Sequence, residues 1–148
     1  MVLTDSSELQ TAVDELSVAL LIAEARRDVA TYTNGHSSAP PPALRPDEDP
    51  KTNPQWHAVS SLAFSVAQRA LVRHEALREA HVDALPMAAC WIAIKFHGTA
   101  LAVDAAVASM IGLGAAVDAA SAARIDFEVD RVLAAERAVL DALDYSVL

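Results

Sequence analysis

The chain is poor in cysteine, glycine and lysine, and it has no cluster of positive charge. Its single cysteine, Cys90, excludes an internal disulfide framework and fits a reducing, intracellular compartment, either cytoplasm or nucleus. With only four glycines and an abundance of alanine and leucine, the composition favours helix on propensity alone. Hydrophobic residues make up 53% of the 148 residues and charged residues 21%, a balance typical of one globular domain with a packed core.

The scarcity of positive charge bears on possible partners. The only lysines are Lys51 and Lys95, and the arginines stand singly apart from Arg26 and Arg27. The formal net charge is −9 and the pI is near 4.8, so the surface as a whole repels a phosphate backbone. Because a nucleic-acid-binding protein needs a local basic patch, we expect no nucleic-acid partner.

No stretch of the sequence reads as a membrane span. A spanning helix needs about 20 consecutive apolar residues. The most apolar stretch, 84–96, is shorter than this and contains Lys95, with His97 directly after it. The N-terminal segment carries Asp5 and Glu8 where a signal peptide would carry positive charge. We therefore expect an intracellular protein with no membrane partner.

The hydrophobic pattern predicts an all-α fold. Apolar residues recur at steps of three and four, the period of one helix face. The stretch that is apolar on every side, about 84–97, should form a helix buried at the centre of the domain. The result is a five-helix bundle, with helices expected at 5–32, 55–79, 84–97, 100–111 and 125–143.

The chain divides into three parts by composition. Residues 1–32 should form the N-terminal helix of the bundle, and 55–148 should form the remainder of the same domain. Between them, 33–54 holds all but one of the seven prolines and reads as an exposed connection.

Local signals predict where the helices begin and end. Asp5 followed by Glu8 has the spacing of a capping box, and Asp83 can cap the central helix. Gly112 and Gly114 are good left-handed residues for stopping the fourth helix. On the last helix we expect these residues to face inwards: Val129, Val132, Leu133, Leu140 and Leu143.

The enzymatic signals are weak. The segment His74–Arg78 begins like the helix of a zinc protease, but an arginine stands where the second histidine is needed. We interpret His74 and His81 as surface or capping histidines. Cys90 lies in the apolar run with no nearby cation to lower its pKa, so a buried structural thiol is expected. The sequence thus predicts no catalytic group, no metal site and no cofactor.

Two charged residues stand out because they interrupt apolar surfaces. Lys95 is the only charged residue between Ala84 and Phe96, and Glu136 falls within the apolar stripe of the last helix. Lys95 could simply lay its stem along the core and reach water, and Glu136 could sit at the edge of the stripe. A charge fixed on an apolar surface is equally typical of an interface anchor, because it gains strength once a partner excludes water.

Both charges lie in segments that resemble helices of the cyclin box. Residues 86–96, an alanine-rich apolar run ending in lysine and an aromatic residue, resemble its third helix. Residues 135–145, where glutamate leads to a Val-Leu pair and a Leu-Asp-Tyr ending, resemble its fifth helix. Residues 62–71, which include Arg69, are similar to its second helix. The resemblance covers roughly residues 55–148.

The resemblance implies a regulatory subunit without enzymatic activity of its own. In cyclins the matching lysine and glutamate hydrogen-bond the segment around the αC helix of a cyclin-dependent-type protein kinase. By this resemblance, the chain would bind and position the αC region of such a kinase. The kinase-facing residues would be Lys95, Phe96, Glu136, Leu140 and Tyr145.

Departures from the cyclin pattern keep other hypotheses open. Gln68 replaces the usual aspartate, and the first helix lacks the Met-Arg-Ala-Ile-Leu signature. The stretch from Lys95 to Glu136 is longer than usual, which implies an extended fourth helix or an extra turn around 112–124. The sequence ends at Leu148, directly after the fifth helix, so we expect a single cyclin box. These features favour, as an alternative, a kinase-independent cyclin-fold adaptor or a kinase inhibitor or mimic. The nucleic-acid-binding cyclin folds of basal transcription factors are disfavoured by the acidic charge.

Overall fold

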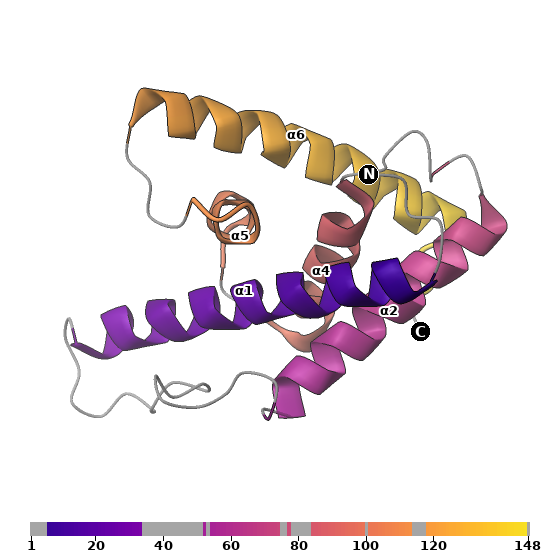
Figure 1. Ribbon diagram of the computed structural model, residues 1–148, viewed down its shortest axis with the longest axis horizontal. Coiled ribbons are helices and arrows are strands. Elements are labelled where there is room, and N and C mark those ends of the chain that lie inside the picture. The colour runs from indigo at the N-terminus through magenta and orange to yellow at the C-terminus, as the bar shows by residue number, and fades with distance from the viewer. Residues whose placement is uncertain are drawn as a thin grey trace.

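The computed structural model describes residues 6–33, 52, 54–74, 77, 84–99, 101–113 and 118–147, with side chains of the first helix described from Ser7 to Glu24. Within these ranges every regular element of three residues or more is an α-helix, which confirms the predicted all-α class (Figure 1). The helices are α1 (Ser6–Thr33), α2 (Pro54–Arg73), α4 (Ala84–His97), α5 (Val103–Met110) and α6 (Ala119–Ala142).

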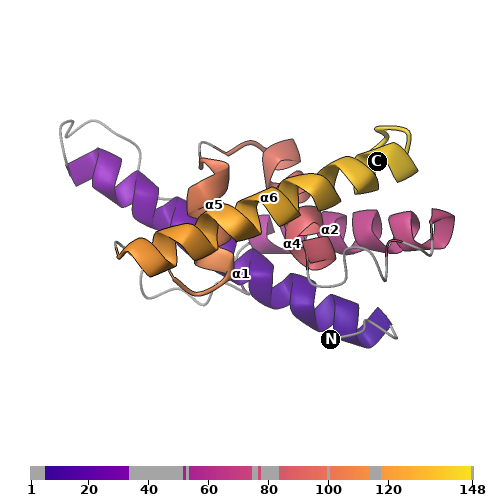
Figure 2. The same cartoon turned by 90° about the horizontal axis from the view of Figure 1, so that it is seen from above.

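Helix α4 occupies the centre of the structure, as its uniformly apolar sequence predicts. All eleven residues from Ala84 to Ile94 are buried, and α4 contacts each of the other four helices. In Figure 1, α1 and α6 lie on opposite sides of α4, and α5 fills the space between α1 and α6. Seen from above, α1 and α6 cross (Figure 2). One hydrophobic core draws residues from all five helices.

Two predicted helices end or begin at different residues. The helix expected over 55–79 ends at Arg73, and Leu77, whose amide donates to the His74 carbonyl at 3.0 Å, is 8% exposed. The helix expected over 100–111 begins only at Val103. There the amide of Leu101 is satisfied by the hydroxyl of Thr99, which accepts at 3.1 Å, and not by a helical carbonyl.

The last helix is longer than predicted and turned differently. It begins at Ala119 and not near 125, since Asp118 caps it by accepting from the amide of Ser121 at 2.7 Å. Backbone hydrogen bonds, chiefly from Ser121, lower the pKa of Asp118. Leu133, expected to face inwards, is 41% exposed, and this prediction is wrong. The fully buried stripe of α6 is Val132, Ala135, Val139 and Ala142, with Leu143 just after the helix.

Polar contacts fix α1 against its neighbours. The carboxylate of Asp14 accepts hydrogen bonds from Gln10 on the same helix and from Ser60 on α2, and the Trp56 indole donates to the Asp14 carbonyl at 3.1 Å. Deeper in the core, the Ser17 hydroxyl lies 3.7 Å from the thiol of Cys90. These contacts set the position of α1 along α2 and α4.

Several predictions fall outside the described residues. They are the caps at Asp5 and Asp83, His81, the stop at Gly114, Arg78, and most of the connection 33–54. The stop at Gly112 is described: Gly112 follows α5 with a φ of +80°, as a helix-terminating glycine does. In the part of the chain that the structure covers, no helix has both the length and the apolarity needed to cross a bilayer.

Candidate partner-binding site

The site is built around an ion pair between two helices. Lys95 lies in the last turn of α4 and Glu136 lies on α6, and the Lys95 ammonium donates to Oε2 of Glu136. The two residues are 41 positions apart in sequence and are brought together by the packing of α4 against α6. The structure thus places side by side the two charges that stood out in the sequence.

The Lys95 ammonium lies over the ring of Trp91. Trp91 lies one helical turn before Lys95 and is 6% exposed, and the lysine Nζ lies 5.1 Å from the centre of its ring. A cation over an indole face is attracted by the ring's quadrupole. The side chain of Lys95 therefore follows the surface of the core and does not extend freely into solvent.

The two charges differ in their access to water. The side chain of Lys95 is 41% exposed, whereas that of Glu136 is 12% exposed. Their mutual bond uses one of the three donors of the ammonium and part of the acceptor capacity of the carboxylate. The pair therefore has further hydrogen-bonding capacity toward a partner, while the sheltered carboxylate keeps the ammonium in place.

Apolar residues lie close to the pair along the same two helices. Phe96, next to Lys95, is 49% exposed and stacks edge-on against His97 with ring centres 5.6 Å apart. Leu140, one turn beyond Glu136, is half-buried and packs against the core. Leu133, one turn before Glu136, is also 41% exposed. Leu133 was missed as a surface residue because its position in an apolar stripe predicts burial.

Tyr145 lies in a turn directly after α6. Its amide donates to the Leu140 carbonyl at 2.8 Å, and its hydroxyl donates to Asp141 at 2.8 Å. The hydrogen bond to Asp141 and the charge of that carboxylate raise the pKa of Tyr145. The Tyr145 residue is 64% exposed. Two arginines of α2, Arg69 and Arg73, contact the same turn, which the sequence did not reveal.

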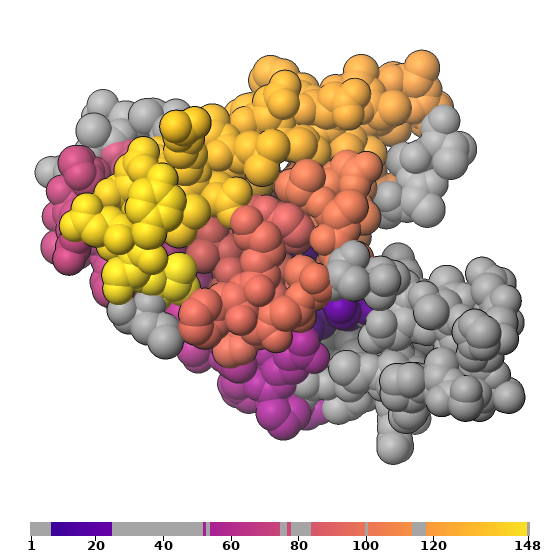
Figure 3. Space-filling model, turned by 180° about the vertical axis from the view of Figure 1, so that it is seen from behind, coloured from indigo at the N-terminus to yellow at the C-terminus, as the bar shows by residue number. Residues whose placement is uncertain are grey.

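The elements that carry these residues share one face of the molecule. In Figure 3, the C-terminal end of α6 with its turn borders α4, and α5 lies beside α4. The five predicted residues thus come from two neighbouring helices and one turn. Among the described contacts, Lys95 and Glu136 are joined through their side chains, and Leu140 and Tyr145 are joined by a backbone hydrogen bond.

The other candidate groups have structural positions. Cys90 is fully buried, and desolvation raises its pKa to about 12, so it is no nucleophile at neutral pH. His74 is exposed at the end of α2. Among the described residues, no three histidine, cysteine, aspartate or glutamate side chains lie close enough together to hold a metal ion.

Comparisons with protein-family models, with curated proteins and with solved structures found no match to this chain. They add nothing to the resemblance to cyclins, which is carried by the three sequence segments alone.

Proposed function

We propose that this chain is a cyclin-like regulatory subunit that binds a cyclin-dependent-type protein kinase through α4 and α6, holding the kinase αC region in place. The observation that carries the proposal is the Lys95–Glu136 pair, set among the exposed or half-exposed side chains of Phe96, Leu133 and Leu140. Aromatic side chains, and charged pairs that lose contact with water in a complex, are typical of interface hot spots.

The physical effect of docking on this pair supports the role. In the free chain the ion pair is partly hydrated, and such pairs contribute little. A partner that covers Phe96 and Leu140 removes this water, so the same charges gain strength and fix the orientation of the partner. The ion pair then stabilises the complex more than it stabilises the free chain.

Kinase activation follows from selective binding of one conformation. A protein kinase is active only when the glutamate of its αC helix pairs with the lysine of the ATP site. A subunit that binds the inward position of αC more tightly than the outward position shifts the equilibrium toward the active state. The same surface would inhibit if it bound the outward position more tightly.

The first test uses purified cyclin-dependent-type kinases and this chain. Wild type is expected to be retained on at least one immobilised kinase, and the Lys95→Ala/Glu136→Ala variant is expected to be lost. The matched control is Glu128→Ala/Arg131→Ala, which removes another ion pair of α6, 3.1 Å long, and should bind like wild type. If the pair variant and wild type are retained equally, the surface is wrong.

A second readout separates activation from the alternative of an adaptor or inhibitor. Phosphate transfer by the retained kinase to a peptide substrate is measured with and without the chain. Activation predicts an increase with wild type and none with the Lys95→Ala/Glu136→Ala variant. Binding with unchanged or reduced transfer supports the inhibitor or mimic and rejects activation, whereas the kinase-independent adaptor predicts no binding to the kinase.

A further inference from the structure

The turn that carries Tyr145 has an unusual backbone. Asp144 and Tyr145 follow each other with φ values of +52° and +62°, both in the left-handed region. That region suits glycine and is uncommon for an aromatic residue, because the Cβ atom crowds the backbone. Two such residues in succession require contacts that hold them, and these contacts decide where the Tyr145 ring points.

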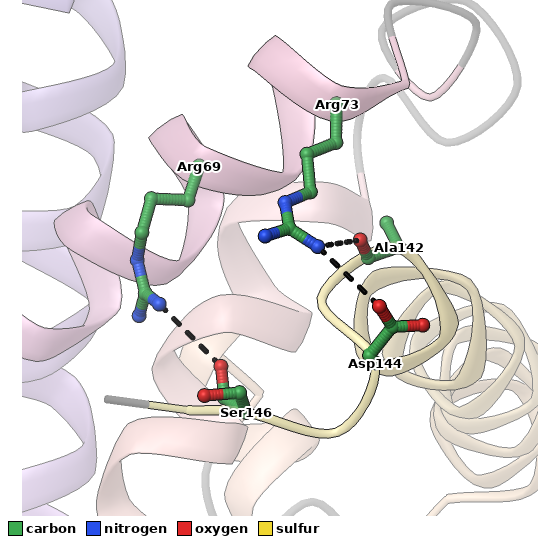
Figure 4. A network of polar contacts seen from close by, with 5 residues as sticks. All are labelled: Arg69, Arg73, Ala142, Asp144 and Ser146. Carbon is green, nitrogen blue, oxygen red and sulfur yellow. Dashed lines mark hydrogen bonds and ion pairs between the residues drawn. The ribbon is translucent and has the colours of Figure 1, made fainter.

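Two arginines of α2 supply contacts on both sides of this turn. Arg69 and Arg73 lie one helical turn apart and both reach toward the end of α6 (Figure 4). Arg73 Nη1 donates to the Ala142 carbonyl at 3.4 Å and pairs with the Asp144 carboxylate at 3.6 Å. Arg69 donates to the Ser146 carbonyl at 3.4 Å and to the Val147 carbonyl.

The partners of the arginines are mostly backbone carbonyls. The last carbonyls of a helix have no helical partner and carry partial negative charge, so a guanidinium is a suitable donor. Arg69 is itself fixed, since its Nε donates to the carbonyl and the hydroxyl of Ser65 at 3.3 and 3.2 Å. A prepositioned guanidinium loses little freedom when it contacts the turn.

Charge attraction alone does not account for the effect of the two arginines on the turn. In the Arg73–Asp144 pair the side chains are 55% and 90% exposed, and such a pair adds little stability in water. Beyond the backbone hydrogen bonds of the turn itself, the arginines add contacts that span the left-handed residues: Arg73 contacts residues 142 and 144, and Arg69 contacts residues 146 and 147.

We infer that Arg69 and Arg73 are positioning residues, which hold the left-handed turn at the end of α6 so that Tyr145 is presented to the partner-binding surface. The effect on binding rests on the proposed function, whereas the effect on the turn does not. A turn that is already held in place need not be ordered during association. Removing the two arginines should therefore weaken binding about two- to tenfold.

The test is amide hydrogen exchange of Tyr145 by NMR in the Arg69→Gln/Arg73→Gln variant. Because the Tyr145 amide donates to Leu140 only while the turn is formed, its exchange should become roughly tenfold faster than in wild type. Amides of α4 should keep their wild-type rates. The control Arg124→Gln, an exposed arginine at the other end of α6, should change neither.

A rescue variant distinguishes positioning from general stabilisation. Glycine adopts the left-handed region without steric strain. Adding Asp144→Gly to the double arginine variant should therefore recover part of the protection at Tyr145. The inference is overturned if the double variant leaves exchange at Tyr145 unchanged, if α4 amides speed up equally, or if the glycine recovers nothing.

Affinity for the kinase is measured on the same proteins. The double arginine variant should bind about as weakly as Tyr145→Ala, within the two- to tenfold range given above; wild-type affinity would overturn the link to binding. A wild-type chain that binds no kinase would reject the proposed function, and hydrogen exchange would still decide whether the arginines hold the turn.

Discussion

Removing the Lys95–Glu136 ion pair should destabilise the free chain only slightly. The informative variants are Lys95→Met, which keeps an apolar stem over Trp91, and Glu136→Gln, which keeps the shape of the side chain, together with the double variant. With the lysine side chain 41% exposed, the coupling between the two residues should be that of a surface pair, about 0.2–1 kcal/mol.

The two single variants should differ. Lys95→Met leaves the more sheltered charge, a carboxylate with 12% exposure, without its cation, so its cost should be about 0.5–1 kcal/mol, the upper part of the range for a surface pair. Glu136→Gln leaves only a lysine that can turn to solvent, so its cost should fall below that range. The ordering of the single variants therefore reports which partner is the more sheltered one.

Urea denaturation followed by circular dichroism measures the free energies of unfolding of the four proteins. The m-values should agree, since the surface exposed on unfolding is the same. The corresponding cycle at Glu128 and Arg131 provides a comparison on the same helix. A coupling above about 2 kcal/mol at Lys95 and Glu136 would refute the reasoning, because a pair of that strength belongs to the core of the fold.

Three further predictions concern the core and the C-terminal turn. Ala93→Leu places three extra carbons at a fully buried site of α4 and should lower the free energy of unfolding by about 1–3 kcal/mol in urea; unchanged stability would show spare room there. A disulfide reagent at pH 8 should modify Cys90 only as fast as the chain unfolds, because its pKa of about 12 leaves about one thiolate in ten thousand; rapid labelling of the folded protein would disprove its burial. In a Tyr32→Phe background, Asp141→Asn should lower the pKa of Tyr145 in an absorbance titration, and an unchanged pKa would exclude the hydrogen bond. Because the pKa of Tyr145 is raised in the folded chain, its contribution to stability should be present below the ordinary tyrosine pKa and disappear as the pH rises through the folded value.

The centre of the fold could be predicted from sequence because its signal is strong. The run from Ala84 to Ile94 is apolar on every side, and only the middle of a bundle can bury such a helix. Lys95 interrupts that run at its end, which marks the point where α4 reaches the surface. The nearness of Glu136 was suggested by resemblance, and it is realised by the contact of α4 with α6.

The orientation of α6 could not be predicted in the same way. The expected inward face included Leu133, but the helix packs through a stripe that contains Ala135 and Ala142. Alanine contributes little to a hydrophobic pattern, although its small side chain lets helices approach closely. The larger leucine therefore suggested burial, while close packing at the alanines turned it outwards.

Helix ends and the arginine contacts depend on the backbone. Helix α2 ends at Arg73, although the sequence has no glycine or proline in the expected helical segment 74–79 to mark that end. Arg69 and Arg73 bind main-chain carbonyls at and after the end of α6, and any sequence offers carbonyls. Such contacts leave no pattern of side chains from which they could be recognised.

The most direct measurement is the dissociation constant between this chain and the kinase that retains it, obtained by titration calorimetry. Compared with wild type, the Lys95→Ala/Glu136→Ala variant should bind at least about thirtyfold more weakly, the loss expected from a hot spot worth about 2 kcal/mol. The Glu128→Ala/Arg131→Ala control should bind as wild type does. Equal affinity of the Lys95→Ala/Glu136→Ala variant and wild type would contradict the proposal that this ion pair anchors a partner.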